Sequence, residues 1–336
     1  MNPNDKITLS HGAGGNATKE LINKVFRKHF SNKTLDALDD AAVIKTGGRK
    51  IAFSTDSFVI NPVFFKGGNI GKLAVCGSIN DISMMGAEPV ALSAAAIIEE
   101  GFPLKDLEII ARSMAAEAKK AGADIVTGDT KVVKKGEADG IFINTSAIGV
   151  IERRFNIAAS NAKAGDSIIV SGNIAEHGSA VMLSRNDFGF KSDIKSDCAC
   201  LNILAQDILK ACPEIHVMRD PTRGGVAAAL NEIAESSNIG IVIDQNAVPV
   251  AKNVAAFCRV LGLDPLYMAN EGKMISFQPA KHTQKVLKAY KKNVLGKNAA
   301  AIGTVVKDLK GVYIKTSSGA LRKVLSSDAE QLPRIC

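Results

Sequence analysis

Acidic side chains stand beside small or hydroxylated residues at several expected strand and loop ends. These carboxylates are Asp39, Asp40, Asp56, Asp81 and Asp129. Mg²⁺ in proteins is usually held by a few carboxylates together with substrate phosphates. Singly, each of these acids is more often a cap or turn residue. Brought together by a fold, they would suit an ATP–Mg²⁺ site.

Asp81 is the most informative of these carboxylates. On an expected helix it lies four residues after Gly77 and eight after Leu73. That spacing places it on the stripe that should face inward. Because a buried carboxylate needs a partner or a metal ion, Asp81 is a candidate ligand.

A glycine-rich segment near the start, His11-Gly12-Ala13-Gly14-Gly15-Asn16-Ala17, precedes an expected helix. It fits the G-x-G-x-x-A pattern of dinucleotide-binding folds. The expected strand before it, at 6–9, is short and polar, whereas a Rossmann first strand is buried and apolar. The segment therefore favours a more general role, in which the backbone N–H groups of Gly12, Gly14 and Gly15 approach phosphate oxygens. A plain N-terminal turn is the alternative.

Two further turns carry charged residues. Arg219-Asp220-Pro221-Thr222-Arg223-Gly224-Gly225 opens at the start of an alanine-rich helix, which is a geometry that suits an anion. Asn270-Glu271-Gly272-Lys273 places a carboxylate and a cation on a tight turn before a strand. A turn with no chemical role is the alternative for the second motif.

The chain ends on a thiol, in Gln331-Leu332-Pro333-Arg334-Ile335-Cys336. A frayed tail is the usual expectation for a terminus. Leu332, Pro333 and Ile335 nevertheless give this tail apolar anchors, so Cys336 could swing its sulfur into a remote site. Cys198-x-Cys200 could form half of a metal site, but no matching Cys/His pair lies nearby, which favours structural cysteines on a helix.

Strands and helices alternate along the chain. Hydrophobic patterning predicts strands at 51–60, 90–98, 124–127, 141–151, 167–171, 239–243, 273–278, 299–306 and 311–316. It predicts helices at 17–30, 70–85, 105–121, 197–211, 224–236, 249–261 and 281–292. A polar, alanine-rich connection near residue 155 divides the chain. We expect two units of α/β or α+β type, with domains at 1–155 and 156–325 and a flexible tail at 326–336.

Composition agrees with a folded protein that binds anions. The chain has 336 residues, 46% hydrophobic and 23% charged residues, no Trp and a formal net charge of +8. No apolar run is long enough for a membrane span, and the N-terminus lacks a signal-peptide pattern. Six cysteines without a dense framework predict free thiols and a cytoplasmic location. Lysines between 281 and 297 are typical of a solvated helix face, so we expect no nucleic acid and no membrane as partner.

Taken together, the motifs resemble the HypE family of hydrogenase maturation factors, the carbamoyl dehydratases. The resemblance covers essentially the whole chain and is most specific at Pro333-Arg334-Ile335-Cys336. It also rests on the glycine-rich start, Ser54-Thr55-Asp56-Ser57, the segment from Gly67 to Leu73 with Lys72, Thr127 to Val133, Arg219 to Gly225, and Asn270 to Lys273. The broader superfamily looks like the aminoimidazole ribonucleotide synthetases, selenophosphate synthetases and thiamine-monophosphate kinases.

The resemblance implies a fold and a set of partners. An N-terminal half-barrel would dimerise into a central β-barrel, with ATP in a groove beside it, and a C-terminal α/β sandwich domain would cover the groove. HypF would load a carbamoyl group onto the terminal thiol, and a HypC–HypD complex would receive the cyanide for the iron of a nickel–iron hydrogenase.

The implied reaction is ATP-dependent dehydration of S-carbamoyl Cys336 to a thiocyanate. Mg²⁺ on some of Asp39, Asp40, Asp56, Asp81 and Asp129 would neutralise phosphate charge. Lys131 would stabilise the reacting oxygen and Glu271 would be the base. Lys72 and Arg223 belong to the matching motifs and are expected to contact the nucleotide. A small-molecule kinase of the same superfamily is the alternative, a non-enzymatic assembly scaffold a further one, and an NAD enzyme a distant one.

Overall fold

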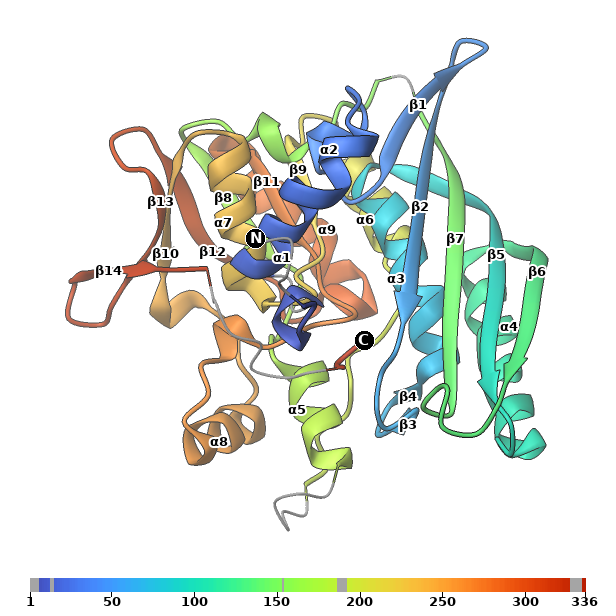
Figure 1. Cartoon of the computed structure of the whole chain (residues 1–336). Coiled ribbons are helices and arrows are strands. Elements are labelled where there is room, and N and C mark those ends of the chain that lie inside the picture. Colours follow the sequence, from blue (N-terminus) through green and yellow to red (C-terminus); the bar gives the residue numbers. More distant parts are fainter. Residues whose placement is uncertain (1–5, 13–14, 153, 186–191, 327–333) are drawn as a thin grey trace.

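The computed structural model describes residues 6–12, 15–152, 154–185, 192–326 and 334–336. Two β-sheets with their helices lie on opposite sides of the C-terminus (Figure 1). The strands of one sheet end at Ile151 and those of the other begin at Asp166. The chain is therefore a mixed α/β protein whose last residue lies between its two sheets.

The first sheet has the strand order β1-β2-β7-β5-β6. Its strands are β1 (Ala42–Thr46), β2 (Arg49–Phe58), β5 (Ala87–Glu99), β6 (Asp124–Val133) and β7 (Ile141–Ile151). Neighbours are antiparallel except β5 and β6, which α4 (Leu104–Ala121) connects as a parallel pair. Gly122, at φ 72°, ends α4, because glycine adopts the left-handed conformation without strain.

Helix α3 (Ile70–Met84) lies between the two units. Its N-cap is Asn69, whose side chain accepts a hydrogen bond from the Lys72 amide at 3.0 Å. The helix packs against β2, β5 and β7 on one side and against α4 and α6 (Asn202–Ala211) on others. Nearly all of its side chains are buried, so a polar residue on it must find a partner within the protein.

The second sheet has the order β14-β13-β10-β12-β8-β11-β9. Its strands are β8 (Asp166–Val170), β9 (Val217–Arg219), β10 (Gly240–Asp244), β11 (Ile275–Pro279), β12 (Ala300–Val306), β13 (Gly311–Lys315) and β14 (Leu321–Val324). Only β10 and β13 pair in parallel among them. The helices of this unit besides α6 are α5 (Glu176–Ser184), α7 (Gly225–Ser236), α8 (Lys252–Leu261) and α9 (Thr283–Lys292).

Several short elements lie outside the two large sheets. A helical segment runs through α1 (Asn16–Leu21), a π-helical turn (Ile22–Phe26) and α2 (Arg27–Phe30), which confirms the predicted helix at 17–30. Its apolar stripe is not buried, since Phe26 is 46% and Phe30 62% exposed. The strands β3 (Phe64–Phe65) and β4 (Gly68–Asn69) pair with each other just before α3.

The structure corrects some predicted elements. The helix expected at 197–211 begins only at Asn202, so Cys198 and Cys200 are not helical. The amide of Ala199 instead donates to the Glu271 carbonyl, and the Leu201 amide donates to the Asn80 side chain. Tertiary contacts thus use the backbone groups that a helix would need. Residues 6–8 form no strand, and Leu9–Gly12 is a 3₁₀ turn.

Several elements were not predicted from the sequence. They are β1, β3, β4, β9, β14 and α5. Most are short or lie at a sheet edge, where hydrophobic periodicity gives little signal. Among the described residues, no helix combines the length and apolar character needed to cross a membrane.

Candidate functional site

The last three residues of the chain are docked between the two units. The Cys336 carbonyl accepts from the Val59 amide at 3.1 Å, and the Arg334 carbonyl accepts from the Asn61 amide at 3.2 Å. The Ile335 carbonyl lies 2.8 Å from Nε2 of His177 on α5. Burial of His177 lowers its pKa, so a neutral ring donates this hydrogen bond. The tail is therefore held by both units at once.

Arg334 and Ile335 anchor the docked tail. Ile335 is only 4% exposed, as an apolar anchor should be. Arg334 donates to the Val59 carbonyl at 2.7 Å and pairs with Asp139, an anchor that the sequence analysis missed. The expected anchors Leu332 and Pro333 lie outside the described residues. Backbone hydrogen bonds and an arginine, as well as apolar contact, position the terminal thiol.

Arg223 holds the thiol of Cys336 in a buried position. Its Nε donates to Cys336 Sγ at 2.8 Å, and its Nη1 donates to the Gly12 carbonyl at 2.5 Å. Arg223 lies in the turn before α7, where Gly224 adopts φ 69°. Burial raises the pKa of Cys336 to about 12 against the opposing effect of the Arg223 guanidinium. The docked sulfur is thus a protonated thiol at neutral pH.

Glu271, in the second unit, lies close to the Cys336 thiol. It is 3% exposed, and none of the described residues donates a hydrogen bond to its Oε1. Burial holds the pKa of Glu271 well above its usual range, and the Asp220 and Asp56 carboxylates reinforce the shift. Gly272 lets this turn approach the 197–199 segment, since a Cβ there would lie 1.8 Å from the Asp197 carbonyl oxygen. An unpartnered, buried carboxyl beside a thiol is a candidate proton acceptor.

Four carboxylates gather where β2, α3 and the end of β9 meet. Asp81 accepts from Ser54 Oγ at 2.5 Å, and Asp40 pairs with Arg219 at 2.8 Å. Burial raises the pKa of Asp56 and holds those of Asp40 and Asp81 well above the usual range. It raises that of Asp220 to about 6. Repulsion from Asp220, Asp56 and Asp40 adds to the shift at Asp81, which means that these acids face one another.

The charge of this carboxylate cluster would favour a divalent cation. Packed, partly desolvated carboxylates repel one another unless a cation or a proton intervenes, and Mg²⁺ prefers such oxygen ligands. Arg219 supplies part of the positive charge that the carboxylate cluster needs. It also pairs with Glu232 at 2.6 Å. The residues that would hold Mg²⁺ are therefore Asp56, Asp81 and Asp220, with Asp40 shared with Arg219. Asp220 is the member of the cluster that the sequence analysis quoted in its motif but did not assign as a ligand.

The remaining predicted site residues are placed as follows. Asp39 accepts from the Ala159 amide at 2.8 Å, which ties the two units together. Lys72 stands in the first turn of α3 and donates to the Gly67 carbonyl at 3.2 Å. Gly12 is exposed and Gly15 caps α1, while Gly14 lies outside the described residues.

Asp129 and Lys131 are not brought to this cluster within one chain. Both are exposed on β6, and Lys131 Nζ lies 2.7 Å from each Asp129 oxygen. That contact lowers the pKa of Asp129. Strand β6 is at the opposite edge of the sheet from β1, with β5 and β7 between it and the Asp56 strand (Figure 1). Lys273, in the Glu271 turn, pairs with Asp197 at 3.1 Å and with Glu176 at 3.2 Å.

The chain is similar to known proteins over nearly its whole length. The model of the AIR synthase related protein N-terminal domain matches residues 38–151, and that of the C-terminal domain matches residues 163–315. A carbamoyl dehydratase HypE from Rhizobium leguminosarum bv. viciae is 50% identical, covering 99% of this chain and 96% of the relative.

Solved structures align over almost the whole chain. A crystal structure of a HypE–HypF complex aligns with a TM-score of 0.88 at 48% identity, covering 91% of this chain and 99% of that chain. A crystal structure of HypE in complex with ATP aligns with a TM-score of 0.82 at 42% identity, covering 98% and 100%. Both the fold and nearly the full length are therefore shared, and the chain belongs to the carbamoyl dehydratase HypE family of AIR synthase related proteins.

Proposed function

We propose that this protein uses ATP to dehydrate an S-carbamoyl group on its own Cys336 to a thiocyanate, which supplies cyanide for the iron of a nickel–iron hydrogenase. The observation that carries the proposal is the docked tail, with Cys336 Sγ 2.8 Å from Arg223 and in electrostatic contact with Glu271 and Asp56. A substrate that is covalently attached to the chain must be brought to the catalytic groups. The docked tail brings the terminal thiol to the carboxylate cluster. The family's relatives are named as carbamoyl dehydratases.

The reaction balances as R–S–C(=O)–NH₂ + ATP giving R–S–C≡N + ADP + phosphate. Bound Mg-ATP would supply the phosphoryl group that turns the carbamoyl oxygen into a leaving group. Asp56, Asp81 and Asp220 would bind the cation. Arg223 would hold the sulfur in position and stabilise the developing negative charge. Glu271 would accept an N–H proton, and burial of the tail would keep water from the activated carbamoyl group.

Loading of the thiol requires a different state of the tail. A thiolate is the nucleophile in carbamoyl transfer, and a thiol whose pKa is about 12 is almost fully protonated at neutral pH. Once the tail undocks, its pKa returns towards the ordinary value for cysteine. We propose that HypF loads the exposed tail and that the docked state performs the dehydration. A HypC–HypD complex would then take the cyanide from an exposed tail.

A homodimer would complete the assembly. The face of the first sheet turned away from α3 exposes apolar side chains without a partner in the single chain, including Phe53, Ile97 and Ile148. Exposed apolar patches of this kind mark association surfaces. We propose that two copies pair through this face to form the central barrel. Asp129 and Lys131, on the edge strand, would then contribute to nucleotide binding from the second chain.

One experiment separates this reaction from the kinase alternative. The protein is incubated with the carbamoyl donor system and ATP, and its C-terminal peptide is followed by mass spectrometry together with ADP release. We expect the peptide first to gain a carbamoyl group and then to lose one water for each ADP formed. ADP formation with an unmodified C-terminal peptide and a phosphorylated small molecule would support the kinase instead.

Replacing Asp81 with Asn is expected to weaken Mg-ATP binding by at least about tenfold, because one anionic ligand becomes neutral. In the wild-type protein, protons compete with the cation, since the pKa values of Asp81 and Asp220 are raised. Mg-ATP affinity should therefore rise as pH rises from about 5 to about 8. Calorimetry at both pH values measures this, with Asp308→Asn, at an exposed position, as the matched control. Equal affinity of Asp81→Asn and wild type would exclude Asp81 as a ligand.

A further inference from the structure

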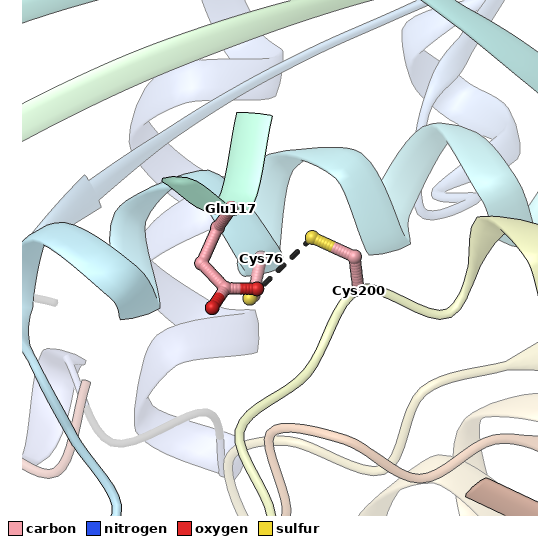
Figure 2. Close-up of side chains that lie close together, drawn as sticks. All are labelled: Cys76, Glu117 and Cys200. Atoms are coloured by element: carbon pink, nitrogen blue, oxygen red, sulfur yellow. Dashed lines mark hydrogen bonds between the residues drawn. The ribbon is translucent and has the colours of Figure 1, made fainter. Parts of the chain in front are cut away.

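Outside the nucleotide site, three side chains from separate elements bring ligand atoms together. Cys76 lies on α3, Glu117 on α4 and Cys200 in the segment before α6 (Figure 2). One ligand atom from each lies within 4.8 Å of the other two. The Sγ atoms of Cys76 and Cys200 are 3.5 Å apart. In the sequence, spacing alone suggested that Cys198 and Cys200 could belong to one metal site. The fold instead brings Cys76 and Glu117, which lie 80 or more residues earlier in the chain, to Cys200.

The separation of the two sulfurs suits a shared metal ion. Tetrahedral Zn²⁺ with bonds of about 2.3 Å to sulfur places two thiolates about 3.8 Å apart. The observed 3.5 Å is close to that value. The carboxylate of Glu117 adds a third donor of a type that Zn²⁺ accepts. A disulfide between the two cysteines would leave this buried carboxylate unexplained and would require an oxidant.

The charges around the cluster also favour a cation. Cys76 has no exposed surface, and the Glu117 side chain is 10% exposed. Lys120 is the only cation in contact with Glu117 among the described side chains. Its Nζ, on the solvent side, lies 2.7 Å from Oε1 of Glu117. A divalent cation would provide the charge that allows both thiols to ionise.

We propose that Cys76, Cys200 and Glu117 form a binding site for a thiophilic divalent cation, best matched by Zn²⁺. Water fills the fourth position, and the Cys198 thiol donates to the Cys76 thiolate from outside the ligand set. The ion joins α3 and α4 to the segment that supports Glu271, in which the Ala199 amide donates to the Glu271 carbonyl at 3.3 Å. Its role is structural: it holds the two units together.

The test uses the full-length, reduced, metal-free protein with Zn²⁺ alone as the probe. A Cys336→Ala background removes the terminal thiol as a competing ligand. We expect this protein to bind one equivalent of Zn²⁺ in competition with a chromophoric chelator and to show a higher melting temperature when loaded. With Co²⁺ in place of Zn²⁺, a sulfur-to-cobalt charge-transfer band should appear.

The ligand variants distinguish a specific site from loose binding. Cys200→Ser, at a half-exposed position, should weaken Zn²⁺ binding by more than about 100-fold, since losing an outer partner alone costs about 10–100-fold. Glu117→Gln should weaken it less, and Cys258→Ser, at a buried cysteine on α8, should leave it unchanged. Circular dichroism verifies that each variant is folded. Absence of Zn²⁺ uptake, equal affinity in Cys200→Ser, or a Cys76–Cys200 disulfide as the only product would overturn the proposal.

Discussion

Replacing Cys336 with alanine is expected to abolish thiocyanate formation completely while leaving the fold and Mg-ATP binding intact. In the proposed reaction the thiol is the attachment point of the substrate, so no other group can substitute for it. The change removes only the contact of Sγ with Arg223 at 2.8 Å, and the backbone hydrogen bonds of the tail to Val59 and Asn61 remain. Mass spectrometry of the C-terminal peptide and a cyanide-release assay measure the loss.

A matched control is available for this variant. Cys258 on α8 is as buried as Cys336, at 1% against 6% exposure, but belongs to neither the tail nor the carboxylate cluster. Cys258→Ala should therefore retain full activity. A carbamoyl label on any of the other cysteines would contradict the carrier role of the terminal residue. These are Cys76, Cys198, Cys200, Cys212 and Cys258.

Replacing Glu271 with Gln is expected to slow dehydration by about 10²–10⁴-fold, the contribution of a positioned general base. Mg-ATP affinity should be unchanged, because the turn keeps its shape through the Glu271 amide and carbonyl contacts with Asp197, Ala199 and Asn80. Single-turnover kinetics on pre-carbamoylated protein isolates this step from loading.

Stability separates a chemical from a structural role of Glu271. Its pKa in the folded protein is raised, so its ionised form is disfavoured and costs stability as pH rises through that pKa. Gln cannot ionise, so the variant should melt at the same or a higher temperature at neutral pH. A lower melting temperature with normal chemistry would instead indicate a structural contact. Glu235→Gln, at an exposed position on α7, is the control and should change neither measurement.

The local chemistry of this protein could be predicted from its sequence. Helix α3 begins at its Asn69 cap and α4 ends at Gly122, because capping and left-handed glycine depend on neighbouring residues alone. Asp81 was assigned to the inward face from helical spacing, and the raised pKa of its carboxyl agrees with burial among acids. The terminal thiol also stood out, since its position in the chain is visible without a structure.

Contacts between distant segments could not be predicted in this way. The segment at 197–201 has helical patterning, but its amides bond to Glu271 and Asn80, and only the packed units reveal that competition. Arg334 and His177 hold the tail through carbonyl oxygens, which every sequence contains and which therefore give no signal.

Sequence alone thus indicated which residues are candidates for chemistry, and it located the start of α3 and the end of α4, because these features depend on side-chain type and on neighbours a few positions away. Tertiary structure decided which of them meet. It placed Cys336 against Arg223 from 113 residues upstream, added Asp220 to the carboxylates and brought Cys76 to Cys200 from 124 residues away. It left Asp129 and Lys131 on the far edge strand of the single chain. Whether distant residues come into contact depends on how the two sheets and helix α3 pack. Burial then shifts the pKa values of groups that this packing encloses.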